Sequence, residues 1–364
     1  MFLLIVTLFV TQPSPAPSKS IAAHLADCHR IAMARNYRIH GSVRAQLKIG
    51  DKGRVQRVFI KKETVKSPLL LRCMKYHLLR QIYPGKRSVE FRFNFPRSRG
   101  QYAVWSQDVP INRSLGNGSA ARVVLDSGSV GAKKFSMTVV RIAKKGRLVS
   151  RFHPKSHSFF FVLDGSGQLE WAQNTKKTKY LPVSTGSAVY LPPGTVYRAS
   201  GASDPPMVLL VIHTPMGPES YLSGGLTGKE TILIPPTGLS MSAKFKPVPG
   251  AGMKAKYKQI NFTSSGVFHG GAVISIPRVG VLGVMHAPNG RRVRVTPARG
   301  GEAALFVAQG AGSLRNARGS WPVQPGSGLY FPVGGTYTPG IATVPLYAVW
   351  FSSSRAPRIE VLKK

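Results

Sequence analysis

Apolar and polar positions alternate with a period of two along most of this chain, which is typical of strands with one buried face. Near the start the spacing changes. Residues 21–36 carry apolar side chains three and four positions apart, which predicts a helix, whereas SVRAQLKIG and RVQRVFIKK predict a hairpin that turns at Gly53. SPLLLRCMKYHLLRQI predicts a second helix, capped by Ser67 with Pro68 at its first position. SVEFRFNF then predicts a third strand.

This order of elements over residues 20–97, with its paired cysteines, Ile-Gly-x-x-Gly-x-Val and Phe-x-Phe, resembles the AgmX/PglI C-terminal domain. That domain is a relative of the TonB C-terminal domain of bacterial envelope proteins, and the resemblance implies a small ββαβ fold that recruits a partner's strand at a sheet edge. Only the segment TQPSPAPSKS separates this domain from the apolar N-terminal residues. A linker of this length is too short for an energy transducer, which must cross the periplasm. We therefore expect docking to an envelope protein.

The chain has two cysteines, Cys28 and Cys73. In an exported protein such a pair is a disulfide candidate, whereas in a reducing cytosol both would be ordinary buried thiols. In the resembling family the cysteines recur on the two helices, so the resemblance implies a Cys28–Cys73 disulfide.

Residues 98–119 are rich in turn formers and are expected to be a linker over the surface of the next domain. Beyond them the sequence repeats: LDGSGQLEW matches AQGAGSLRN, and AVYLPPGTVYRASG matches GLYFPVGGTYTPG. Gly165 and Gly310 are 145 positions apart, and Gly194 and Gly334 are 140 apart, which indicates a duplicated domain.

Short alternating runs between Gly and Pro turns predict an antiparallel barrel or jelly roll in each copy. Each copy resembles a cupin, with the strand-ending Gly-x-Gly and the later Pro-x-Gly turn, so the two together resemble a bicupin. We expect a multidomain α+β and all-β protein in which a first cupin spans residues 120–240 and a second spans 250–364.

A metal-binding cupin usually has His-x-His and Glu in its first motif and a further His in its second. Here the position of the acid is Ser158 and that of the last histidine is Tyr197. His153 and His157 remain as candidate ligands because positions four apart share a strand face, but Pro154 predicts a turn between them. His213 is a further candidate for the pocket.

The second copy has Glu302 and Tyr337 as candidate pocket residues and no histidine in either motif. We expect no three side-chain nitrogen or oxygen donors to converge within residues 120–222, and therefore no cofactor. The alternative is a divalent metal bound by His153 and His157, with Tyr197 or His213 completing the site.

Composition extends this interpretation. Lys and Arg total 51 against 13 Asp and Glu, a formal charge of +38, which favours acidic polymers such as an anionic cell-wall glycan. The sequence has no zinc-finger spacing and no RNA-recognition signature, so nucleic acid is not expected. Residues 1–19 read as a signal peptide and short linker, although no Lys or Arg precedes the apolar run, which suggests a periplasmic or secreted protein.

Three functions remain open. The favoured one is an exported, non-catalytic bicupin that binds a small molecule or a partner, with a homodimer implied by the cupin resemblance. The alternatives are a metal-dependent isomerase, dioxygenase or lyase in the first cupin, and a charge-driven binder of anionic glycan.

Overall fold

The computed structural model describes residues 19–34, 36, 38–84, 88–95, 103–109, 117–153, 155–172, 178–215, 254–259, 269–287, 292–316, 319–333, 338–339 and 345–362. The chain divides into two compact units, Met1–Gln101 and Tyr102–Lys364. The predicted signal peptide lies outside the described residues, apart from its last position. No helix within the described ranges is long and apolar enough to cross a bilayer.

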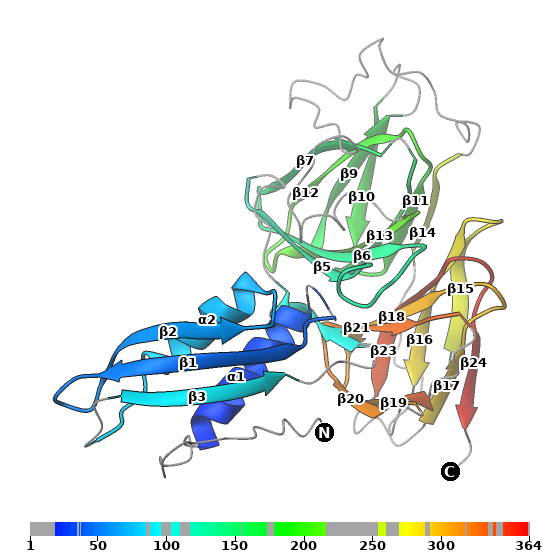
Figure 1. The fold of residues 1–364 in the computed structure, drawn as a ribbon. Coiled ribbons are helices and arrows are strands. Elements are labelled where there is room, and N and C mark those ends of the chain that lie inside the picture. Colours follow the sequence, from blue (N-terminus) through cyan, green and yellow to red (C-terminus); the bar gives the residue numbers. More distant parts are fainter. Residues whose placement is uncertain are drawn as a thin grey trace. The chain divides into compact units, whose positions relative to one another are not determined.

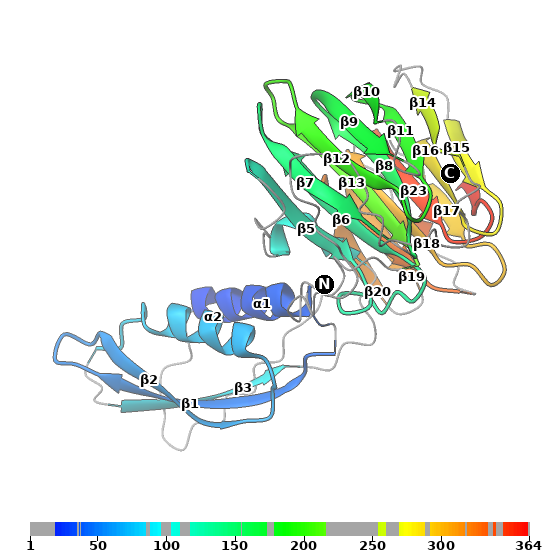
Figure 2. The same cartoon turned by 90° about the horizontal axis from the view of Figure 1, so that it is seen from above.

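The N-terminal unit packs two helices against one face of a three-stranded sheet (Figures 1 and 2). Its elements are α1 (Lys19–Met33), β1 (Gly41–Ile49), β2 (Val55–Glu63), α2 (Pro68–Leu78) and β3 (Ser88–Phe95), in sheet order β2-β1-β3. Both predicted helices and all three strands are therefore confirmed. Ser67 caps α2 by accepting a hydrogen bond from the backbone N–H of Leu70 at 3.3 Å, and Pro68 opens the helix as predicted.

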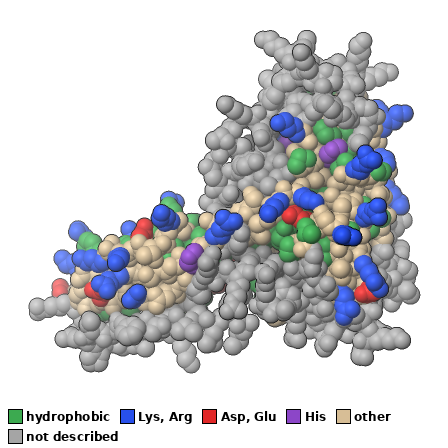
Figure 3. Space-filling model, turned by 45° about the vertical axis from the view of Figure 1, so that its right-hand side comes forward, with side chains coloured by type: hydrophobic (Ala, Val, Ile, Leu, Met, Phe, Trp, Pro, Cys, Tyr) green, Lys and Arg blue, Asp and Glu red, His purple; other side chains and the backbone are tan. Residues whose placement is uncertain are grey.

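The other face of this sheet is open within the unit and strongly basic. Arg44 on β1 pairs with Arg92 on β3 and with Lys62 on β2, and Lys48 pairs with Arg57, so these side chains share the face opposite the helices. Figure 3 shows Lys and Arg side chains over the visible surface of this unit, with few acidic ones.

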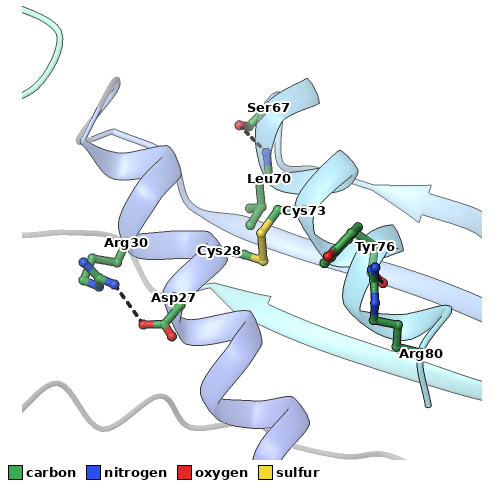
Figure 4. The surroundings of a disulfide bond; sticks show 8 residues. All are labelled: Asp27, Cys28, Arg30, Ser67, Leu70, Cys73, Tyr76 and Arg80. Carbon is green, nitrogen blue, oxygen red and sulfur yellow. Dashed lines mark hydrogen bonds and ion pairs between the residues drawn. A yellow bond between two sulfur atoms is a disulfide. The ribbon is translucent and has the colours of Figure 1, made fainter. Parts of the chain in front are cut away.

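A disulfide joins the two helices (Figure 4). Cys28 of α1 and Cys73 of α2 are bonded, with their Cα atoms 5.6 Å apart, so the expected disulfide is present. Cys28 is fully buried, in a core that includes Leu25, Leu70 and Phe91.

The second unit contains two β-barrels of similar design. The first consists of β5 (Ser119–Leu125), β6 (Ser136–Ile142), β7 (Arg147–Phe152), β8 (His157–Asp164), β9 (Ser166–Ala172), β10 (Lys179–Ser184), β11 (Ser187–Leu191), β12 (Val196–Gly201) and β13 (Met207–Thr214). Its sheets have the orders β10-β9-β12-β7 and β14-β11-β8-β13-β6-β5, in which β14 is Lys256–Gln259.

The second barrel consists of β15 (His269–Ile276), β16 (Gly280–Ala287), β17 (Arg292–Thr296), β18 (Ala303–Gln309), β19 (Gly312–Asn316), β20 (Gly319–Val323), β21 (Ser327–Phe331), β22 (Thr338–Pro339), β23 (Leu346–Ser352) and β24 (Arg358–Leu362). Its sheets have the orders β15-β16-β23-β18-β21-β4, β20-β19-β22 and β17-β24, in which β4 is Ala103–Trp105.

The two glycines of the sequence repeat occupy equivalent turns. Gly165 and Gly310 both have positive φ, +74° and +91°. A Cβ atom at Gly165 would meet the carbonyl oxygen of Pro206, which directly precedes β13, and a Cβ atom at Gly310 would meet that of Pro345, which directly precedes β23. Only glycine combines this backbone conformation with so close a neighbour.

Each barrel takes a strand from the segment that precedes the other. Strand β4 (Ala103–Trp105), followed by the short helix η1 (Ser106–Asp108), lies in the expected linker and pairs with β21 of the second barrel. Strand β14 (Lys256–Gln259), within the predicted second cupin, pairs with β11 of the first. Part of the linker is therefore an edge strand, which the sequence did not reveal because three residues are too few for a periodic pattern.

The barrels also pack together through aromatic side chains. Phe351 of β23 lies with its ring centroid 5.4 Å from that of Phe135 and 5.3 Å from that of Phe159, both in the first barrel. Phe135 in turn lies against Tyr330 of β21.

Candidate functional site

Two histidines and a tyrosine meet inside the first barrel. The hydroxyl oxygen of Tyr197 lies 2.8 Å from Nε2 of His153 and 3.5 Å from Nε2 of His213. The ring centroids of His153 and His213 are 4.3 Å apart, and all three side chains are at most 2% exposed. A hydroxyl can donate to one imidazole and accept from the other, so these groups form a continuous buried polar chain.

Strand register explains why these residues meet. His213 of β13 pairs with Ser136 of β6 and with Ser158 of β8, which gives one row of polar side chains on the larger sheet. Tyr197 reaches this row from β12 of the smaller sheet, and its ring lies edge-on to Phe160, with centroids 5.0 Å apart.

This cluster contradicts the expectation that no three donors converge within residues 120–222. His153, Tyr197 and His213 supply two nitrogens and one oxygen at a single place. The expectation was wrong because each of the three residues was a candidate by itself, whereas their convergence depends on strand register, which the sequence does not reveal. Of the predicted pocket residues, Ser158 lies in the same row and is 3% exposed.

His157 lies elsewhere. Its Nδ1 is 2.9 Å from the hydroxyl oxygen of Tyr190, which belongs to the same outward-facing layer as Phe159, against the second barrel. The structure therefore does not bring His157 and His153 together. Strand β7 ends at Phe152 and β8 begins at His157, so His153 and His157 do not lie on one continuous strand and the rule that positions four apart share a face does not apply.

The structure places Glu302, the candidate pocket residue of the second cupin, at the contact between the two barrels. Its carboxylate accepts hydrogen bonds from the backbone N–H groups of Lys133 and Lys134, both at 3.0 Å, and these belong to the first barrel. Glu302 is 3% exposed, and these hydrogen bonds join the second barrel to the first, whereas its expected place in a pocket stays a prediction. Tyr337 lies outside the described residues.

Arg151 is a site residue that the sequence analysis missed. It pairs across the strands with Tyr197, so both side chains leave the sheet on the barrel side, and Arg151 is only 4% exposed. A bulge between Tyr197 and Ala199 sets this orientation. In a chain with 51 Lys and Arg, a single arginine is expected to be an exposed surface residue. Only the strand register shows that the side chain of Arg151 is on the buried face.

Two further polar atoms point the same way. Thr138 is on the barrel-facing side of β6, one row from Ser136, and Trp171 of β9 pairs with Tyr197. Oγ1 of Thr138 and Nε1 of Trp171 are buried and have no hydrogen-bond partner among the described residues. Buried donors of this kind normally have a partner, so both are available to a bound molecule.

The deeper part of the barrel is closed by apolar side chains. A void of about 10 Å³ remains there, which is room for one water molecule at most. It is lined by Phe160, Val162, Leu169, Val183, Val189, Ala199, Met207 and Leu209. This void therefore has no room for an organic ligand.

The comparisons with known proteins bear on the fold alone. No family model matches the chain, and no curated protein matches it. Among solved structures, a serine-to-alanine mutant of Bacillus subtilis oxalate decarboxylase matches with 14% identity, a TM-score of 0.52, and coverage of 73% of this chain and 81% of that one. A structure of the same enzyme at pH 4.6 matches with 12% identity, a TM-score of 0.51 and coverage of 73% and 80%.

The chain has a bicupin fold. The two barrels, their repeated turns and the likeness to bicupin enzymes agree on this, which confirms the cupin part of the sequence interpretation. The resemblance of residues 20–97 to the AgmX/PglI domain stays a prediction.

The residues of the cluster allow a test of whether a metal ion fits. Ligand bonds of about 2.1 Å in tetrahedral geometry place donors about 3.4 Å apart, close to the observed 2.8 and 3.5 Å. Imidazole and phenolate donors suit a divalent transition ion. The charge fits less well, because the buried Arg151 that pairs with Tyr197 is always positive.

We expect the half-buried His157 to make stability depend on pH. Burial lowers its pKa to about 4, whereas in the unfolded chain the pKa is near 6.5. Between these values the unfolded chain binds the extra proton, so stability is lost as pH falls from about 6.5 to about 4, by about 2 kcal/mol after allowance for part exposure. Urea unfolding across this pH range measures the effect. The His157→Gln variant should show a shallower dependence, and an equal slope in both proteins would contradict the assignment.

Proposed function

We propose that the first cupin binds a small carboxylic acid at its polar end. The observation that carries the proposal is the buried Arg151 beside Tyr197, His153 and His213. A guanidinium holds a carboxylate with two parallel hydrogen bonds, and such charge-assisted bonds are the strong ones. Oγ1 of Thr138 and Nε1 of Trp171 offer additional donors.

Calorimetric titration of the full chain with acids of two to four carbons, and with the matching amides, tests this proposal. We expect the acids to bind and the amides to bind at least tenfold more weakly. Arg151→Gln should weaken acid binding by about thirtyfold, since a hydrogen bond to a charged group contributes about 2 kcal/mol. Arg147→Gln, an exposed position on the same strand, is the matched control and should bind normally. Equal losses in both variants, or equal binding of amides, would reject the carboxylate site.

A metal-dependent enzyme is the second candidate, favoured by the spacing of the three donors. His153, Tyr197 and His213 would hold the ion, which when bound would act as a Lewis acid toward a substrate oxygen. Metal analysis of the purified protein separates the candidates. One tightly held transition ion per chain that is lost in His153→Ala and in His213→Ala, with no loss in His157→Ala, would favour the enzyme.

The basic open face of the N-terminal sheet supports an anionic glycan as partner. The face carries five cations around Phe59, which is 42% exposed, and one acid, Glu90, which pairs with Arg44 at 3.1 Å. Carboxylates along a polysaccharide complement such an array, and Phe59 adds apolar surface for a sugar ring. The cations are Arg44, Lys48, Arg57, Lys62 and Arg92.

Binding of the full chain to polygalacturonate at several salt concentrations tests this partner. Changing the five cations to glutamine should weaken binding at least tenfold and flatten its salt dependence. The matched control removes five exposed cations of the second unit, Arg141, Lys144, Arg147, Lys179 and Lys258, so that the net charge falls equally. An equal loss in the control would mean that charge acts without a dedicated face. The disulfide supports an oxidising compartment, where such glycans occur.

A further inference from the structure

Four metal-ligand side chains gather between the two helices of the N-terminal unit. His24 and Cys28 are four positions apart on α1, and Cys73 and His77 are four positions apart on α2. Residues at this spacing lie on one face of a helix. The donor atoms of Cys28, Cys73 and His77 lie within 4.8 Å of one another, and the rings of His24 and His77 stack with centroids 4.4 Å apart.

We propose that reduction of the Cys28–Cys73 disulfide creates a zinc site in which both thiolates, His24 and His77 bind one Zn²⁺. Two thiolates and two imidazoles in a tetrahedron are a ligand set that structural zinc favours. This site is in the N-terminal unit and is independent of the function proposed for the first cupin.

The two helices already place the ligands. Around zinc, two thiolate sulfurs bonded at about 2.3 Å are about 3.8 Å apart in a tetrahedron. The Cα atoms of Cys28 and Cys73 are 5.6 Å apart, so rotation of the two side chains is enough to reach that separation. His77 is partly buried beside the cysteines and His24 is exposed, which leaves the His24 ring free to turn toward the ion.

The chemistry balances with a dithiol as the reductant. The dithiol gives two electrons and two protons to the S–S bond and itself becomes a disulfide, leaving two protein thiols. Zinc binding then displaces both thiol protons, because the thiolate is the metal ligand. In the reverse exchange, a small-molecule disulfide accepts the two electrons, takes up two protons from water and becomes a dithiol; this restores the Cys28–Cys73 bond, removes two of the four ligands and releases the ion. The same pair of cysteines therefore alternates between a covalent bond and a metal site.

Cobalt titration of the full chain, reduced with a phosphine and kept free of oxygen, tests the proposal. We expect one Co²⁺ per chain with the visible absorption of tetrahedral cobalt and a thiolate-to-metal band, both removed by added Zn²⁺. The oxidised protein should show neither band. Octahedral spectra in the reduced protein, or the same bands in the oxidised one, would overturn the site.

Histidine variants decide whether the ligands are those named. His24→Gln and His77→Gln should each weaken cobalt binding at least tenfold and alter the visible band, while His40→Gln, an exposed histidine of the same unit, should bind normally. As a second measurement, zinc should slow alkylation of the reduced cysteines in the native chain and fail to do so in the double variant His24→Gln/His77→Gln. Tetrahedral bands that persist in that double variant would overturn the proposal.

Discussion

Replacing Cys28 and Cys73 by alanine is expected to lower the free energy of unfolding of the N-terminal unit by about 4 kcal/mol. The bond closes a loop of 45 residues, and loss of that constraint lets the unfolded chain gain conformational entropy of this size in the chain-entropy model. The free energy of unfolding of a small domain is only about 5–15 kcal/mol, so this loss is a large part of the domain's stability. Alanine is the better replacement because it buries no hydroxyl at Cys28, which is fully buried.

The two units can be followed separately in the same urea titration. All four tryptophans, Trp105, Trp171, Trp321 and Trp350, belong to the second unit, and both α-helices of the described residues belong to the first. The helical signal in circular dichroism should therefore shift to lower urea, while tryptophan fluorescence should keep its midpoint. Phosphine reduction of the unaltered chain with a chelator present should reproduce the shift. Equal movement of both signals, or of neither, would show that the disulfide does not act on the N-terminal unit alone.

The sequence predicted elements well where the pattern was local. Ser67 and Pro68 predicted the start of α2, and the alternation in SVEFRFNF predicted β3 with the residues that the strand has in the structure. Gly165 and Gly310 revealed the duplication because each occupies a turn that only glycine fits. Such features depend on a few neighbouring residues, and tertiary contacts did not overrule them.

The site was predicted less well because it depends on register. His153 and His213 are 60 positions apart in the sequence and meet only because β13 and β7 lie on opposite sides of one barrel. A bulge in the pairing of β7 with β12, opposite Arg198, directs Arg151 toward the inside of the barrel, and the sequence contains no pattern that predicts this bulge. Ser158 and Tyr197 were placed by their offsets from Gly165 and Gly194, which shows that motif spacing can locate a pocket whose chemistry has changed.

Glu302 provides the sharpest test of the contact between the barrels. Glu302→Ala is expected to lower the free energy of unfolding of the second unit by about 3 kcal/mol. The substitution leaves the N–H groups of Lys133 and Lys134 without their acceptor, and a hydrogen bond to a charged group contributes about 1.5–3 kcal/mol. Tryptophan fluorescence in urea measures the change. Glu360→Ala is the matched control, because Glu360 is 31% exposed in an ion pair with Arg358 and should cost less than about 1 kcal/mol.

The sign of that result separates an anchor from a ligand group. A carboxylate kept for binding is held at some expense of stability, so its removal is commonly neutral or stabilising. Removal of a carboxylate that joins two barrels breaks its hydrogen bonds without relieving any strain or repulsion, so the free energy of unfolding falls. A loss near 3 kcal/mol would therefore assign Glu302 to the contact between the barrels, and its absence would return Glu302 to the candidates for a pocket in the second cupin. Small-molecule recognition in this chain would then rest on the first barrel, where Arg151, His153 and His213 converge on Tyr197.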